Sequence, residues 1–344
     1  MRKLLFVGLG LVAVLYLLPA AVRMTGAGDS LAIDFEQLDL PGAVPVNQES
    51  GGQAPAGTQQ TDTPVSEAHD HTTVTALIDG KETELPLESY VEGVVAAEIS
   101  NDFPLDAIRA QAVAARTYAV YKIDRGRPEA HPGADVCDDY HHCAAYRDVA
   151  VETAAGSDLS RVQQAVKDTA GQILTYDGAP IAAVFHCASG PRTESAADVW
   201  GGDDTPYLKS VVSPGGTACD QYESAVTVKA DDFRKAVAEV FPSADVSGAP
   251  KTWFKASVRS DAGGIKTVKL GGVTVEGTAV RTLFGLNSTN FTITYTKDSI
   301  TFHSIGFGHG VGLSQYGARY MAEQGADYKE ILMHYYPGSE FSDV

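Results

Sequence analysis

Two neighbouring stretches carry apolar side chains at the spacing of an α-helix. The first has Tyr90, Val91, Val94 and Val95 on one face, and a carboxylate follows on that face at Glu98. The second is rich in alanine and places small side chains on one side, with polar residues interleaved: Ile108, Ala112, Ala115 and Ala119, then Arg109, Gln111 and Arg116. Pro104 between them suits the first turn of a new helix. The pattern predicts a buried helical hairpin.

The charges in this apolar hairpin need a physical explanation, because burying an unpaired charge is costly. Glu98 could be a solvated residue at a helix end, or it could pair with Arg116 and staple the hairpin. In the third interpretation, apolar neighbours raise the pKa of the Glu98 carboxyl, so that it donates a proton near neutral pH. The periodicity of the sequence alone does not decide among these three interpretations of Glu98.

The remaining chain shows strand and helix patterns in an irregular order. Apolar runs predict strands at residues 74–78, 172–176, 180–186, 225–228, 254–258, 265–270 and 291–302, and a polar partner strand at 81–84. Asp79-Gly80 and Asp177-Gly178 are typical hairpin turns. Helical patterns fit residues 158–169, 230–240, 313–324 and 328–335. We therefore expect an α+β fold of mixed or antiparallel strands around the hairpin, with residues 74–344 forming one elongated domain, or two intimate subdomains as the alternative.

The first 25 residues predict a transmembrane anchor. Residues 4–22 carry no charge and are long enough to cross a bilayer as a helix. Arg2 and Lys3 precede this run, so the positive-inside rule places the N-terminus in the cytoplasm and the rest outside. A cleaved signal peptide is the alternative. Residues 26–73 are rich in Gly, Pro, Gln and Thr without periodicity, which predicts a flexible extracytoplasmic linker.

The strongly negative net charge argues against nucleic acid as a partner. The formal net charge is −18 and the sequence pI is about 4.8. Proteins that bind nucleic acid carry basic patches. Nucleic acid is therefore not an expected partner, whereas a neutral glycan is compatible with an acidic surface.

The four cysteines fall into two groups. The segment HPGADVCDDYHHC holds two thiols and three imidazoles: His131, Cys137, His141, His142 and Cys143. Two thiolates and two imidazoles suit a closed tetrahedral zinc site, but a Cys137–Cys143 disulfide beside exposed histidines is equally compatible with the spacing. Cys187 and Cys219 favour a disulfide in an extracytoplasmic protein, with free buried thiols as the alternative.

Three separated segments resemble those of the stage II sporulation protein D family. The first is YVEGVVAAEI followed by FPLDAIRAQAVAARTYAV, within the hairpin; the second is HCASGPRTES with PYLKSV, between residues 182 and 211; the third is GFGHGVGLSQYG, residues 306–317. The resemblance spans about residues 75–344. It implies a membrane-anchored lytic transglycosylase that cleaves peptidoglycan during engulfment in spore-forming bacteria, with 74–344 as the catalytic domain.

The implied reaction needs only one carboxylate. Glycosidases usually use two, but in lytic cleavage the C6 hydroxyl of muramic acid attacks its own anomeric carbon, and the product end is a 1,6-anhydro sugar. Glu98 stands at the motif position of the catalytic acid and base. The resemblance implies glycan strands already stripped of stem peptides as the preferred substrate.

The resemblance also implies roles for other residues. Sugar positioning is expected from Arg116, Tyr207, Lys209 and Tyr316, although Tyr207 and Lys209 also fit ordinary exposed strand positions. The glycine-rich loop of residues 306–312 is expected to face sugar hydroxyls through its amides and His309, or to hold His309 as a structural residue, with Gln315 and Tyr316 on the first turn of the next helix. Ser189 follows a buried strand and lies near His186, which would suit a serine nucleophile, but the GxSxG motif of such enzymes is absent. Ser189 is therefore expected to line the cleft.

The resemblance also implies a zinc site near the catalytic glutamate, as in some relatives, because His131, Cys137, His142 and Cys143 match the ligand spacing of those relatives. Other relatives lack these ligands, so the zinc is expected to brace the loop beside the cleft and not to be essential to the reaction type. Catalysis on metal-bound water is the less favoured role. Expected partners are a cell-wall amidase and a multi-spanning membrane protein, at the mother-cell membrane facing the forespore. A non-catalytic amidase enhancer, which stimulates a wall amidase, is the alternative function, and a zinc amidase is less favoured because HExxH is absent.

Overall fold

A computed structural model describes residues 71–344, so the expected anchor and all but the end of the expected linker lie outside the described residues. Its helices are α1 Leu87–Glu98, α2 Leu105–Arg125, α3 Val149–Ala154, α4 Ser160–Asp168, α5 Ala196–Trp200, α6 Ala230–Val240, α7 Gly277–Phe284, α8 Gln315–Glu323 and α9 Tyr328–Tyr335, with 3-10 turns at Gly216–Ala218 and Pro250–Thr252. Across residues 71–344 there is no helix with the length and apolar character that crossing a bilayer requires.

The strands form small sheets. They are β1 Thr73–Ile78, β2 Lys81–Pro86, β3 Val136–Cys137, β4 Gln172–Tyr176, β5 Ala179–Pro180, β6 Phe185–His186, β7 Glu223–Lys229, β8 Phe254–Arg259, β9 Ile265–Leu270, β10 Val273–Glu276, β11 Phe291–Tyr295, β12 Ser299–Ile305, β13 Leu313–Ser314 and β14 Glu340–Asp343. The sheet orders are β2-β1-β3, β10-β9-β8, β11-β12-β7, β13-β6 and β14-β4-β5. Helices and strands alternate irregularly, which confirms the predicted α+β class.

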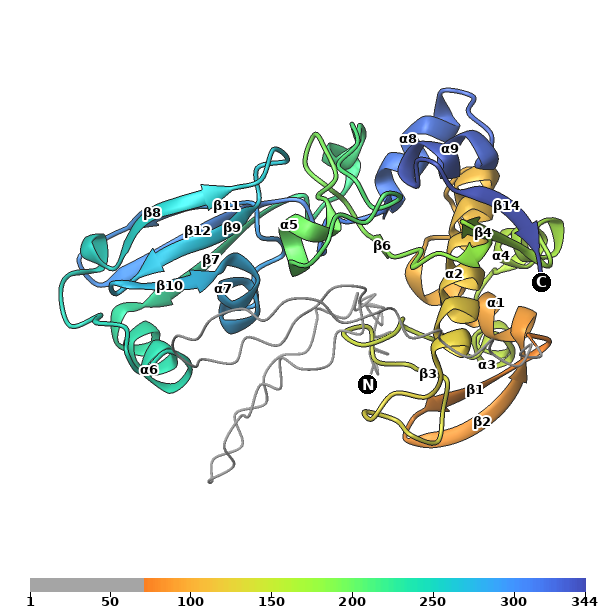
Figure 1. Ribbon diagram of the computed structural model, residues 1–344, viewed down its shortest axis with the longest axis horizontal. Coiled ribbons are helices and arrows are strands. Elements are labelled where there is room, and N and C mark those ends of the chain that lie inside the picture. The colour runs from red at the N-terminus through yellow and green to blue at the C-terminus, as the bar shows by residue number, and fades with distance from the viewer. Residues whose placement is uncertain (1–70) are drawn as a thin grey trace, which may run out of the picture. The chain divides into compact units, whose positions relative to one another are not determined.

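The first hydrophobic core is built around α2, as the hairpin pattern predicted. It draws on residues 74–208 and 311–336. In Figure 1, α2 has α1, α4 and the β4–β14 pair around it, and contacts with α8 and α9 complete its surroundings. The alanines of α2 are almost fully buried, including Ala110, Ala112 and Ala114. Small side chains let all these neighbours approach the helix closely, so α2 has no solvent-facing side along most of its length.

Arg116 has a different role from the two that its sequence position suggested. Its side chain is 0% exposed, and its Nε and Nη2 donate to the two carboxylate oxygens of Glu88 at 2.8 and 2.6 Å. Its Nη1 donates to the Gln172 carbonyl at 3.2 Å. The bidentate pair therefore ties α2 to α1 and β4. Arg116 is therefore not the partner of Glu98, which removes one of the three interpretations of Glu98. An enclosed guanidinium cannot contact a sugar in this structure, so the implied sugar-positioning role of Arg116 was wrong.

Residues 230–302 form a second hydrophobic core, whose extent was not predicted. Two three-stranded antiparallel sheets, β10-β9-β8 and β11-β12-β7, enclose it with α6 and α7. Its centre is aromatic: Phe233 stacks on Trp253 at 4.6 Å and on Phe284 at 4.8 Å between ring centroids. The described part of the chain thus has two cores, which agrees with the alternative of two subdomains and not with a single core.

Most predicted elements agree with the structure, including the hairpin turns. Asp79-Gly80 and Asp177-Gly178 have positive φ angles of 49°, 73°, 51° and 79°, the geometry of tight hairpins. Three predictions were wrong in detail. Residues 291–302 form two strands, because Thr296 and Ser299 close a turn. Residues 181–184 are buried but bond locally (Ala183 N–H to the Ile181 carbonyl), so 180–186 is not one strand. The helix expected from 313 begins at Gln315.

The bidentate pair makes a stability prediction. Glu88→Gln removes the carboxylate and leaves the Arg116 guanidinium buried without its counter-charge. We expect a loss of about 3 kcal/mol in the free energy of unfolding, the lower end for a broken buried pair, because water still reaches the half-exposed Glu88. Urea denaturation measures this. Glu92→Gln on the same helix is the control and should change stability by less than about 0.5 kcal/mol; equal effects would contradict the role of the pair.

Candidate functional site

Glu98 is the last residue of α1, whose apolar face is buried as predicted. Its Oε1 accepts a hydrogen bond from the backbone N–H of Ala145 at 3.1 Å, and its Oε2 accepts one from Nε2 of Gln315 at 3.4 Å. Burial raises the pKa of the Glu98 carboxyl, while the two hydrogen bonds lower it. No cation among residues 71–344 contributes to the environment of this carboxyl. Glu98 therefore holds its proton to higher pH than an exposed glutamate does.

The first turn of α8 brings the glycine-rich segment to this acid. Ser314 caps the helix by accepting a hydrogen bond from Gly317 N–H at 3.3 Å, which fixes the start of α8 at Gln315. Tyr316 donates its backbone N–H to the Cys187 carbonyl at 3.0 Å. Burial raises the pKa of Tyr316 to about 12, so its phenol stays neutral. Two segments about 200 residues apart, both singled out in the sequence, thus meet at Glu98.

The glycines before α8 allow this approach. Gly312 has a φ of 70°, and a Cβ built on it would overlap the carbonyl oxygen of Val184. Any other residue there would push the loop away from the buried 181–184 segment. The glycine-rich segment is therefore held close to the first core by backbone contact, which sets the position of Gln315.

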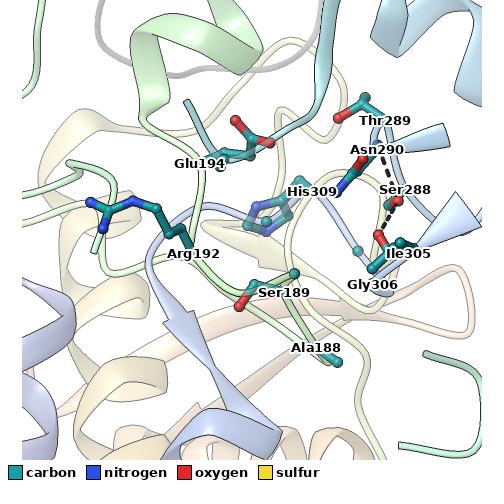
Figure 2. Close-up of a pocket in the computed structure, with 14 residues that line it drawn as sticks. Ala188, Ser189, Arg192, Glu194, Ser288, Thr289, Asn290, Ile305, Gly306 and His309 are labelled. Atoms are coloured by element: carbon teal, nitrogen blue, oxygen red, sulfur yellow. Dashed lines mark hydrogen bonds between the residues drawn. The ribbon is translucent and has the colours of Figure 1, made fainter. Parts of the chain in front are cut away.

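A small cavity lies beside Ser189 and His309 (Figure 2), and Glu98 is not part of its lining. Its free volume is about 20 Å³, which suits roughly one water molecule and not a sugar ring. Nε2–H of His309 donates to the Phe185 carbonyl at 2.9 Å, and Nδ1 accepts from Val311 N–H at 3.1 Å. Both ring nitrogens are therefore used within the protein, which supports the structural interpretation of His309. The Ser189 hydroxyl is buried and without a hydrogen-bond partner in the described chain.

Tyr207 and Lys209 lie in an irregular segment and not on a strand. Lys209 is exposed and pairs with Asp204 at 2.6 Å. The Tyr207 hydroxyl accepts a hydrogen bond from Ala182 N–H at 3.4 Å, and burial raises its pKa. Neither residue bonds to Glu98 in the described chain, so their contact with a substrate stays a prediction.

Four residues of the loop after α2 form a candidate metal centre. The ligand atoms of His131, Cys137, His142 and Cys143 all lie within 4.8 Å of one another. The His131 Nε2–His142 Nδ1 distance is 3.0 Å, and Cys143 Sγ lies 3.5 and 3.3 Å from these two nitrogens. Zn–N bonds of about 2.0–2.1 Å and Zn–S bonds of about 2.3 Å place tetrahedral ligands roughly 3.3–3.8 Å apart. The group therefore fits a zinc ion with small adjustments.

The surroundings of this group also suit a metal. His131 Nδ1 bonds to the Ala134 carbonyl at 2.8 Å, which leaves the lone pair of Nε2 directed to the other ligands. A hydrogen bond from Cys143 lowers the pKa of the Cys137 thiol to about 4, so one thiolate forms readily. Cys137 and Cys143 are free thiols, and the predicted alternative of a disulfide between them is not formed. His141, the fifth candidate, is exposed and bonds to Asp139.

Cys187 and Cys219 are neighbours in space, as the sequence interpretation required. Their sulfur atoms lie 3.7 Å apart, but both are free thiols, so the favoured disulfide is not present. The negative charge of Glu98 is one cause of the raised pKa of Cys187, after the hydrogen bond to Cys219 and burial. The pair therefore lies near the acid.

Sequence reasoning missed two groups. The backbone N–H of Ala145 bonds to Glu98, and a main-chain donor leaves no signal in residue types. Glu194 is a second buried carboxylate, 6% exposed, whose Oε1 accepts a hydrogen bond from Gly264 N–H at 3.0 Å. Its position within the HCASGPRTES segment was the only available hint.

Comparison with known proteins assigns the family. Residues 80–176 match the family described as "Stage II sporulation protein". The chain is 34% identical over 265 residues to stage II sporulation protein D of Bacillus subtilis (strain 168), covering 76% of this chain and 75% of that protein, and 35% identical to the same protein of Bacillus amyloliquefaciens. It is 28% identical over 299 residues to the amidase enhancer of Bacillus subtilis, covering 72% of this chain and 40% of that protein. The chain therefore belongs to the stage II sporulation protein D family, as its three segments indicated.

Proposed function

We propose that this protein is a lytic transglycosylase acting on peptidoglycan during sporulation. It cleaves glycan strands, preferably those without stem peptides, between N-acetylmuramic acid and N-acetylglucosamine. The observation that carries the proposal is the environment of Glu98: a half-buried carboxyl with a raised pKa, two neutral hydrogen-bond donors and no cationic partner in the described chain. A structural glutamate would be expected to have a salt bridge, as Glu88 does.

Proton transfer from Glu98 balances the reaction without water. The carboxyl gives its proton to the glycosidic oxygen as the bond from that oxygen to the muramic acid C1 breaks. The C6 hydroxyl then attacks C1, and its proton returns to the Glu98 carboxylate. The products are a free 4-hydroxyl on N-acetylglucosamine and a 1,6-anhydro muramic end. The donors Ala145 N–H and Gln315 Nε2 keep the carboxyl oriented in both protonation states.

Neighbouring residues support sugar binding in this proposal. Tyr316 lies beside Gln315 on the first turn of α8, with a neutral phenol that can donate to a sugar oxygen. Tyr207 and Lys209 are further candidates for substrate contact, by resemblance to the family. Arg116 is not among them because it is enclosed and paired with Glu88.

Zinc is the proposed cofactor of the candidate metal centre. His131, Cys137, His142 and Cys143 would supply two imidazole nitrogens and two thiolates, a closed set that leaves no open position for substrate. When bound, the ion would cross-link the loop after α2. The chemistry of the reaction is left to Glu98.

We also propose the membrane as the location, through residues 1–25, with the described domain outside the cytoplasm at the mother-cell membrane facing the forespore. A wall amidase that removes stem peptides and a multi-spanning membrane protein are the proposed partners. The similarity to a protein named amidase enhancer supports contact with an amidase.

A non-catalytic amidase enhancer is the second candidate function. The similarity to a protein of that name favours it. The two candidates differ in one result: an enhancer does nothing to peptide-free glycan strands unless an amidase is present, whereas a transglycosylase cleaves them alone.

The first prediction concerns Glu98→Gln. It should leave folding intact and reduce the release of 1,6-anhydro ends from peptide-free glycan by at least about 10²-fold, because general acid–base action contributes roughly 10²–10⁴-fold. Mass spectrometry of the strand ends measures this. Glu92→Gln is the matched control, since burial also raises the pKa of Glu92 on the same helix. Normal anhydro product from Glu98→Gln would refute the assignment.

The second prediction concerns pH. A general acid must be protonated in the free enzyme, so kcat/KM should be maximal below the pKa of Glu98 and fall about tenfold per pH unit above it. Because burial raises this pKa from its usual 4.5, the fall should begin at higher pH than for an exposed glutamate. A pH–rate profile of glycan cleavage measures it. A midpoint at or below 4.5 would contradict the buried-acid interpretation.

The third prediction concerns the metal. We expect the purified protein to contain one zinc per chain, and Cys137→Ser to lose it because one of four ligands is gone. Elemental analysis measures the content, with Cys187→Ser as the control that keeps the zinc. Metal-free wild-type protein with a Cys137–Cys143 disulfide would decide against a zinc site.

A further inference from the structure

The backbone N–H that reaches Glu98 comes from the segment directly after the candidate metal centre. Ala145 follows the ligand Cys143 by two residues. Its N–H donates to Glu98 Oε1 at 3.1 Å. The position of a main-chain donor depends on where its segment is held, so the contacts of residues 144–147 decide whether this bond forms.

One end of this segment is fixed on α1. The backbone N–H of Arg147 donates to the Gly93 carbonyl at 3.1 Å. The Tyr146 ring packs directly over Gly93, where a Cβ would overlap it, and stacks on Tyr90 with centroids 5.9 Å apart and planes 11° apart. Gly93, five residues before Glu98, therefore provides the gap that lets Tyr146 lie flat on the helix.

The other end of the segment is fixed by the metal-binding group. Cys143 Sγ lies 3.3 Å from His142 Nδ1 and 3.5 Å from His131 Nε2. The Cys143 backbone N–H also donates to the Asp139 carbonyl at 2.8 Å. Without an ion, thiols and imidazoles at these distances hold the loop only by weak hydrogen bonds, whereas four metal–ligand bonds would fix Cys143 firmly.

We propose that the metal-binding loop is the positioning device of the acid: with the ion bound, residues 144–146 lie against α1, cover Glu98 and present the Ala145 N–H to its carboxyl. The inference rests on the proposed role of Glu98 and on the fit of the four ligands. It means that full activity depends on the metal although the ion touches neither substrate nor acid. Ala145 and Tyr146 are then positioning residues.

The titratable groups around Glu98 are neutral at neutral pH, so the position of this loop is the main influence on the pKa of Glu98 that can change. Tyr90 on α1 faces it, and burial raises the pKa of that phenol well above its usual value. Cys187 faces it from beside β6, with a pKa raised by its hydrogen bond to Cys219 and by burial. Both are neutral at neutral pH, and Gln315 on α8 is uncharged. The acidity of Glu98 is therefore set by burial, which raises its pKa, and by two hydrogen bonds, which lower it.

Deleting the Ala145 hydrogen bond and removing the metal should shift the pKa of Glu98 in opposite directions. Ala145→Pro deletes only the donor N–H, so the carboxylate loses a stabilising bond and the pKa of Glu98 rises. Removing the metal releases the whole segment, so water reaches the carboxyl; the larger influence of burial is lost and the pKa falls. Ala145→Ser keeps the N–H and is the matched control for the first perturbation.

The experiment is a carbon-13 NMR titration of glutamate-labelled protein, with the Glu98 signal assigned from Glu98→Gln. We expect the titration midpoint to move upward in zinc-loaded Ala145→Pro, to stay unchanged in Ala145→Ser, and to move downward in wild-type protein after chelation. The ratio of kcat/KM at high pH to that at low pH should rise by up to about tenfold in Ala145→Pro, the factor for one hydrogen bond of ordinary strength. Unchanged midpoints after chelation would overturn the proposal.

Gly93→Ala covers the case in which the proline variant does not fold. Its Cβ displaces the Tyr146 ring, so the Glu98 midpoint should move downward while elemental analysis still finds the metal. In Gly93→Ala, chelation of the metal should no longer change the titration midpoint of Glu98. A Glu98 midpoint equal to that of the wild-type protein would contradict the inference. NMR observes the Glu98 carboxyl directly, so unchanged midpoints would overturn the inference whether or not the protein is active. The proposed function has a separate test: it is wrong if the wild-type protein releases no anhydro ends.

Discussion

The desolvation of one carboxyl group is the constraint on which the rest of this site depends. Glu98 ends a helix whose apolar face, on which it lies, is buried in the first core, and its oxygens accept hydrogen bonds only from neutral donors in the described chain. A cation at that place would have lowered the pKa and made the group a permanent carboxylate. The nearby hairpin shows the contrast, because Glu88 has such a cation in Arg116. One helix thus carries a salt-bridged glutamate, Glu88, and the proposed general acid, Glu98, distinguished by their partners.

The fold brings two segments that are distant in sequence, the start of α8 and the loop after α2, to the C-terminal end of α1, where Glu98 lies. The cap at Ser314 sets the start of α8, and a close backbone approach at Gly312 holds that start against the first core. The loop after α2 arrives from the other side with Ala145. Each contact is a main-chain or amide donor, which orients a carboxyl without fixing its charge. Such an arrangement suits a group that must give a proton and take it back.

Sequence reasoning succeeded where residue type determines position. Periodicity located α1, α2, α6 and α9, and the turn residues at 79–80 and 177–178 located two hairpins. It failed where tertiary contacts decide: the buried run 181–184 has strand composition but local bonds, and no pattern revealed that residues 230–302 form their own core. The partner of Arg116 was not identified because spacing cannot tell which of the three glutamates on α1 it faces. The Ala145 N–H could not be found because any residue but proline supplies it.

The most direct test of the central claim is the source of the oxygen in the new strand ends. Peptide-free glycan is digested by the purified protein alone in water labelled with heavy oxygen, and the ends are analysed by mass spectrometry. Intramolecular attack by the C6 hydroxyl predicts anhydro muramic ends without the label. Labelled reducing ends would mean that water attacks and that one carboxyl is not sufficient, and no new ends at all would contradict the proposed transglycosylase activity.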